Sequence, residues 1–109
     1  MARPFETLKI SGTSDPTLVA GAIAGTLREH GRCTMEAIGP NAVNQLLKAV
    51  AVARGYVAPQ GMDLWCQPSF CDVVLDGVTK TAIRVHVLRW FGRVPEPEGV
   101  LDSPDSGML

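Results

Sequence analysis

Residues 37–59, AIGPNAVNQLLKAVAVARGYVAP, decide how this chain folds. The Gly39-Pro40 pair ends an extended segment and puts proline in the first turn of a helix, where its missing N–H breaks no hydrogen bond. Apolar residues then recur at helical spacing and predict a buried face made of Val43, Leu46, Leu47 and Val50. Arg54-Gly55 is expected to close this helix. A strand that leads directly into an amphipathic helix is typical of a small α/β domain.

The segment before this stretch has the same order of strand and helix. Alternation over residues 5–10 predicts a first strand, and residues 33–38 alternate as a second one. Between them Pro16 begins a helix, with Ser14 or Asp15 as its cap. The serine-rich loop before Pro16 is either an ordinary capped loop or a phosphate-binding helix start, because free N–H groups point out of such a start.

The first helix is expected to bury one face and to carry two glycines on the other. Its predicted core stripe is Val19, Ile23 and Leu27 with Ala22 and Thr26 beside them, and Gly31 ends the helix. Gly21 and Gly25 lie on the predicted outward side, beside Ala24. Glycine inside a helix costs about 1 kcal/mol relative to alanine. Two of them indicate either close approach by a partner or tight packing inside the domain.

The second half of the sequence reads as a long β-hairpin. Met62–Leu75 and residues 79–90 are the predicted strands, and Asp76-Gly77 is a strong two-residue turn. Pro68 restricts its strand to a sheet edge, a bend or a bulge. On the last strand the expected inward residues are Thr81, Ile83, Val85 and Val87, and the expected outward ones are Lys80, Arg84 and His86. The element order β-α-β-α-β-β predicts a two-layer α/β sandwich with both helices on one face of a small sheet.

Composition predicts one domain over residues 1–91, followed by a disordered tail over residues 92–109 that is rich in Pro, Gly and acid. The net charge of the 109 residues is −1. The tail carries four acids against Arg93, which is −3, so the remainder carries +2. This mildly basic domain is compatible with nucleic-acid binding.

Several classes of protein are not expected from this sequence. No apolar run is long enough to span a bilayer and the N-terminus has no hydrophobic signal region, so a cytoplasmic protein without a membrane partner is predicted. Cys33, Cys66 and Cys71 show no CxxC spacing, which favours buried reduced thiols over a disulfide framework or a metal site. No nucleophile elbow or phosphate loop is present, and we expect neither an enzyme nor a cofactor.

A set of short motifs makes the chain resemble the stage V sporulation protein S family over about residues 6–87. They include Leu8-Lys-Ile-Ser11 and Ala37-Ile-Gly39, and the set continues through residues 16–25, 44–45, 48–51, 53–55, 57–59, 76–77 and 81–83. The resemblance implies the fold of the Alba chromatin proteins and the binding of nucleic acid. Two Alba features differ here. The loop before the first helix has Asp15 and no base, and the hairpin between the last two strands, which is long in Alba, is expected to be only residues 75–79.

Taken together, these patterns favour a homodimer or higher oligomer that binds DNA or RNA through backbone phosphates as a regulatory or architectural protein. The candidate nucleic-acid contacts are Lys9, Lys48, Arg54, Lys80 and Arg84. Trp65 and Trp90 either stack on bases or serve as core or interface aromatics. The candidate oligomer contacts are Gly21, Gly25 and Val52. The alternative is an oligomeric protein-interaction module that does not bind nucleic acid.

Overall fold

The structure is a computed structural model that describes residues 7–92. The elements follow the predicted order: β1 (Leu8–Ile10), α1 (Pro16–His30), β2 (Arg32–Ala37), α2 (Pro40–Val57), a 3₁₀ turn (Ala58–Gln60), β3 (Met62–Leu75) and β4 (Val78–Phe91). The first predicted strand is shorter than expected, and residues 5–6 lie outside the described residues. The predicted tail also lies outside them from Arg93 onward, so its disorder stays a prediction.

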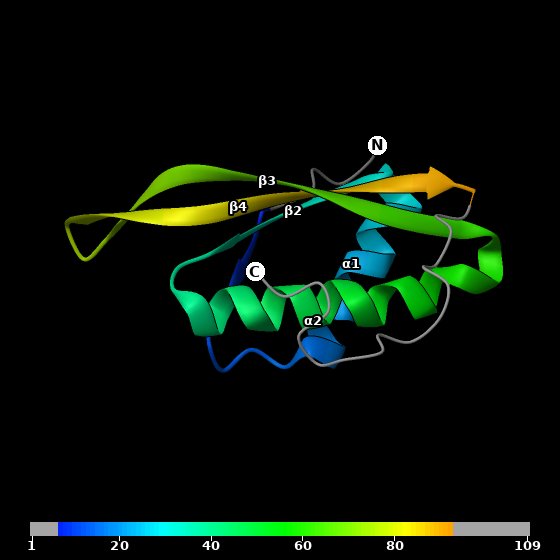
Figure 1. Cartoon of the computed structure of the whole chain (residues 1–109), viewed down its shortest axis with the longest axis horizontal. Helices are drawn as coiled ribbons and strands as arrows, with labels where there is room; N and C mark the ends of the chain where they lie inside the picture. The colour runs from blue at the N-terminus through cyan, green and yellow to red at the C-terminus, as the bar shows by residue number, and fades with distance from the viewer. Residues whose placement is uncertain (1–6, 93–109) are drawn as a thin grey trace, which may run out of the picture.

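The four strands form one mixed sheet in the order β1-β2-β4-β3. β1 runs parallel to β2, whereas β2 and β3 both pair with β4 in antiparallel fashion. Both helices lie on the same side of this sheet (Figure 1). The predicted two-layer α/β sandwich is therefore confirmed, and within residues 7–92 no helix lies over the opposite face of the sheet.

Local sequence signals set both ends of α1. Asp15 provides the cap, since its carboxylate accepts a hydrogen bond from the Thr17 backbone N–H at 2.9 Å. Gly31 ends the helix in the left-handed region at φ 78°. The capped-loop interpretation of the segment before α1 is thus the one that the geometry supports.

The predicted end of α2 at Arg54-Gly55 is wrong. The helix continues to Val57, and the left-handed stop is Gly61 at φ 72°, after the 3₁₀ turn. Val57 is completely buried. Burial of a valine side chain contributes about 1.5–3 kcal/mol, which exceeds the helix cost of about 1 kcal/mol for Gly55.

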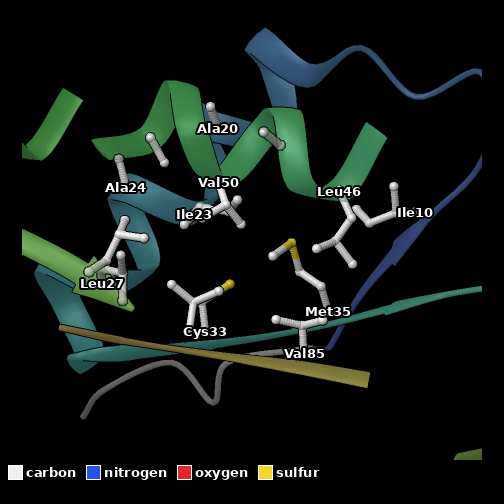
Figure 2. Packing of buried hydrophobic residues seen from close by; sticks show 14 of the residues in the cluster. Ile10, Ala20, Ile23, Ala24, Leu27, Cys33, Met35, Leu46, Val50 and Val85 are labelled. Carbon is white, nitrogen blue, oxygen red and sulfur yellow. The ribbon is translucent and has the colours of Figure 1, made fainter. Parts of the chain in front are cut away.

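The core lies between the helices and the sheet (Figure 2), and it differs from the predicted stripes at four positions. Leu47 and Ala22 were expected inside but are exposed, Leu47 by 55%, whereas Ala24 was expected outside and is buried. Each helix packs against the other helix as well as the sheet, so small residues complete its buried arc. The buried arc of α2 consists of Ala42, Leu46, Ala49, Val50, Ala53 and Val57. Thr81 is exposed because β4 extends beyond its pairing with β2 at that point.

The β3–β4 hairpin reaches well past the rest of the sheet (Figure 1). Its strands pair along 14 residues each, but β2 covers only residues 83–88 of β4. We call residues 70–82, which continue beyond β2, the hairpin arm. Asp76 and Gly77 form its turn with φ 50° and 76°. The expectation of a hairpin limited to residues 75–79 is therefore wrong: its turn has two residues, but its long strands carry it well beyond β2.

Candidate nucleic-acid interface

Most of the candidate functional side chains lie on the sheet face opposite the helices. Val85 and Val87 of β4 are buried against the helices, so alternation turns the neighbouring even-numbered residues to the other side. Strand register adds the residues that pair with them. We call this surface the helix-free face. Its polar and aromatic members include Lys9, Thr34, Glu36, Trp65, Gln67, Lys80, Arg84, His86 and Trp90.

A carboxylate at the centre of this face holds two of the predicted cations. Glu36 forms an ion pair with the Lys9 ammonium through Oε1. Arg84 donates from Nε and Nη2 to Glu36 Oε2 at 2.8 and 2.6 Å. Glu36 is buried, but the side chains of Lys9 and Arg84 remain 70% and 40% exposed. One buried negative charge therefore fixes two cationic groups that still face solvent.

The protonation of this cluster is set by its hydrogen bonds. Those from Lys9 and then from Arg84 lower the pKa of Glu36 below its ordinary value. The hydrogen bond to Glu36 likewise raises the pKa of Arg84. Both effects favour the charged forms, so at neutral pH the three groups together carry one net positive charge.

His86 is held on the same face by a neighbouring strand. Its Nδ1 lies 3.0 Å from the Thr34 hydroxyl, which is buried on β2. This contact orients the imidazole beside the Glu36 cluster, since Thr34 and Glu36 are two residues apart on one strand.

Two exposed tryptophans lie at the far end of the face. The ring centroids of Trp65 and Trp90 are 6.1 Å apart with the planes at 65°, an edge-to-face arrangement. They are 55% and 48% exposed. The interpretation of these residues as core aromatics is therefore excluded, and they remain available for an interface or a ligand.

The structure brings only part of the predicted nucleic-acid set together. Lys9 and Arg84 meet at Glu36, and Lys80 lies on the same face, on the hairpin arm. Among the described residues no acid pairs with Lys80. Lys48 and Arg54 belong to α2, in the other layer.

Both residues of α2 have partners within the domain. Arg54 donates to the two carboxylate oxygens of Asp63, at 2.9 and 3.1 Å, and thereby fastens the last turns of α2 to the start of β3. Lys48 contacts the Gln45 side chain at 3.3 Å. The geometry thus assigns Arg54 a structural contact.

Sequence reasoning missed Glu36 as the centre of the cluster. The alternation of β2 put Glu36 on the face opposite to Cys33 and Met35 without saying which face is buried. The sequence does not give the strand register, however, and only register puts Glu36 opposite both Lys9 and Arg84.

Of the three predicted oligomer contacts, the two glycines are exposed and the valine is half-buried. Gly21 and Gly25 are exposed, and an added Cβ at either position would meet no atom within 4 Å. This excludes tight packing inside the domain as the reason for these glycines. Val52 is half-buried and packs against the core, so its side chain already has a partner within the domain.

Two open clefts flank the helix-free face and the second helix. One, of about 510 Å³, lies between the end of β1 and the hairpin arm and is lined by Lys9, Gly12, Ile38, Leu75 and their neighbours. The other, of about 610 Å³, lies beside the Arg54–Asp63 pair. Within residues 7–92 no three His, Cys, Asp or Glu side chains converge as a metal site would require. The three cysteines are free, and burial raises the pKa of Cys33 to about 11.

Fold and face together define a small two-layer α/β protein with an open, cationic sheet face. None of the described helices is long and apolar enough to cross a membrane. The family model for Stage V sporulation protein S (SpoVS) matches residues 6–90, which is most of the chain. The chain therefore belongs to the SpoVS family, and this membership supports its assignment as a sporulation-stage protein.

Proposed function

We propose that this protein binds nucleic acid across the helix-free face, mainly through backbone phosphates, as a regulatory or architectural factor. The observation that carries the proposal is the pair of exposed cations, Lys9 and Arg84, fixed on an open sheet by the buried Glu36. Because these groups are already positioned, little side-chain entropy is lost when a phosphate binds. The function is one of binding, and it requires no catalytic step.

The spacing along β4 suits an extended anionic partner. Lys80 and Arg84 are four residues apart on the same face, a separation of roughly 13 Å at about 3.3 Å per residue. Cations at such intervals contact successive parts of a phosphate backbone without reading its sequence. We place this activity in the cytoplasm, because free thiols are typical of a reducing compartment.

A salt-titrated binding assay with DNA and RNA tests this proposal, and the chain offers a matched control. Lys80→Ala removes a cation from the helix-free face, whereas Lys48→Ala removes the same charge from the helical layer. We expect Lys80→Ala to weaken binding to every sequence and to reduce the slope of log K against log salt by about one. Lys48→Ala should leave the slope nearly unchanged. Absence of binding at low salt, or equal losses in both variants, would contradict the proposed face.

A second candidate function is self-association, and the apolar hairpin arm favours it. On the helix side of the arm Phe70 and Val74 are 79% and 68% exposed, and on its other face Leu75 and Val78 are 47% and 55% exposed. Exposed apolar side chains gathered on one segment are typical of interaction sites. We infer a homodimer or higher oligomer in which the arm contacts a second copy of the chain. The open surface at Gly21 and Gly25 provides a further place of close approach.

Light scattering distinguishes this inference from a monomer. Phe70→Lys should lower the measured mass toward that of a single chain, because a charge would be buried in the contact. Leu47→Lys, which makes the same change at an exposed apolar residue of α2, serves as the matched control. A clean monomer for the unmodified chain at micromolar concentration would contradict self-association.

A further inference from the structure

The tryptophan pair is the part of the helix-free face that phosphate binding does not use. Trp65 and Trp90 are the only two tryptophans in the chain, and both keep about half of their surface exposed. They lie on the same face as Arg84 and His86, at the end of β4 opposite to the hairpin arm. Large aromatic surface next to ordered cations is the combination found in proteins that bind single-stranded nucleic acid.

The geometry of the pair leaves aromatic surface available for a base. In an edge-to-face pair one ring presents only its edge, so both of its faces stay free of the other ring. The backbone at Gly92 also lies close to Trp90, since a Cβ there would lie 3.0 Å from its Nε1.

Register places the rings at a useful distance from the cations. Trp90 is four residues from His86 and six from Arg84 along the same face of β4, which is roughly 13 and 20 Å at about 3.3 Å per residue. A strand whose phosphates lie at the Glu36 cluster therefore extends over the tryptophans within a few nucleotides. There its bases meet ring faces and its backbone meets cations.

This arrangement discriminates between single and double strands. The faces of duplex bases are covered by their neighbours in the stack, so a duplex offers the protein its phosphates, sugars and groove edges. Unpaired bases can turn outward and stack on an aromatic ring. We propose that the helix-free face selects single-stranded nucleic acid, with Trp65 and Trp90 as the stacking platform. This inference rests on the proposed nucleic-acid binding and names its substrate class.

Intrinsic fluorescence tests the inference directly, because all indole emission comes from these two residues. The full chain is titrated at low salt with a single-stranded oligonucleotide, as DNA and as RNA, and with the duplex of the same sequence. We expect the single strands to quench emission and to bind at least tenfold more tightly than the duplex. Trp90→Ala should weaken single-strand binding roughly tenfold and leave duplex binding unchanged.

Two variants control for indirect effects. Tyr56→Ala removes a partly exposed aromatic ring from α2, in the other layer, and should leave single-strand binding unchanged. Trp65→Phe keeps a stacking ring, so binding should be retained while the emission reports Trp90 alone. If Trp90→Ala fails to fold, Trp90→Leu, which keeps apolar volume but no aromatic ring, should weaken single-strand binding in the same way.

The outcomes separate this inference from the proposed function. Equal affinity for single strand and duplex, without quenching, would overturn single-strand selection and leave phosphate binding in place. No binding to either form would overturn both. Preference for RNA over DNA, or the reverse, with quenching by the preferred single strand would support the inference and identify the sugar that the face accepts.

Discussion

Replacing Glu36 with Gln should lower the stability of the fold and strengthen nucleic-acid binding at the same time. The substitution keeps the size of the side chain and removes the charge that holds Lys9 and Arg84. The cluster then loses its only acid while both cations remain on the helix-free face. A change that is unfavourable for folding is thus favourable for an anionic ligand.

The expected loss of stability follows from the contacts of Glu36. Lys9 and Arg84 use different oxygens of Glu36, whereas a glutamine has one acceptor oxygen and an NH2 that only donates. One cation then loses its acceptor and the other loses the partner charge, and hydrogen bonds to charged groups contribute about 1.5–3 kcal/mol. Solvent screening reduces this, because both cations are substantially exposed. We expect a total near 1.5 kcal/mol, which for a domain of this size lowers Tm by roughly 6–12 °C.

The dependence on pH identifies the cause. Since the pKa of Glu36 is lowered in the folded protein, its stabilising effect is fully present above its ordinary pKa. The effect is lost as the pH falls through the lowered value in the folded state. Urea denaturation of the unmodified chain and of Glu36→Gln should therefore differ at pH 7 and converge in acid, below about pH 4.

Three results would refute this reasoning. Equal stability at pH 7 would show that the cluster contributes nothing to folding. A difference that stays constant down to acid would show that the Glu36 charge is not its source. Weaker binding of nucleic acid by a folded Glu36→Gln variant would show that the positioning of Lys9 and Arg84 by Glu36 contributes more to binding than the removal of its negative charge does.

Two further substitutions test the packing. Leu46→Ala should cost about 2–5 kcal/mol in a urea titration because Leu46 is completely buried, and its neighbour Leu47→Ala should cost less than about 1 kcal/mol because Leu47 is 55% exposed; similar losses would mean that the α2 face is misassigned. Gly25→Ala should raise Tm by the equivalent of about 0.5–1 kcal/mol, since the added Cβ meets no atom within 4 Å in one chain. A loss of stability that grows with protein concentration would instead place Gly25 in an oligomer contact.

The order of elements could be predicted because each boundary has a local cause. Gly39-Pro40 starts α2, Gly31 ends α1, and Asp76-Gly77 turns the hairpin, each through its own backbone preference. The end of α2 could not be read in this way. Burial of Val57 outweighs the local signal at Gly55, and burial depends on the rest of the fold.

The helix surfaces could be predicted only in part. Periodicity gives the direction of the apolar side of a helix, but α1 and α2 each have two neighbours, the sheet and the other helix. Their buried arcs are therefore wider than one stripe and are completed by alanines. Hydrophobicity alone ranked Leu47 above Ala24 for burial, although the structure buries Ala24 and exposes Leu47.

The candidate interface was predictable residue by residue but not as a site. Alternation along β4 put Lys80, Arg84 and His86 on one face, as the structure has them. The register of β1, β2 and β4 puts these residues on one face with Lys9 and Glu36. Local sequence patterns do not determine this register, because the strands are far apart in the sequence. The tryptophan pair depends on the same register between β3 and β4.

Mapping of the ligand on the surface by NMR tests most directly the claim that the helix-free face binds nucleic acid. A single-stranded oligonucleotide is titrated into the labelled full chain while backbone amide and indole N–H resonances are followed. We expect the largest shifts along β4 from Lys80 to Trp90, with movement of both indole signals and no change around Lys48 on α2. Shifts confined to the helical layer, with both indole signals unchanged, would contradict the assignment of the helix-free face as the binding surface.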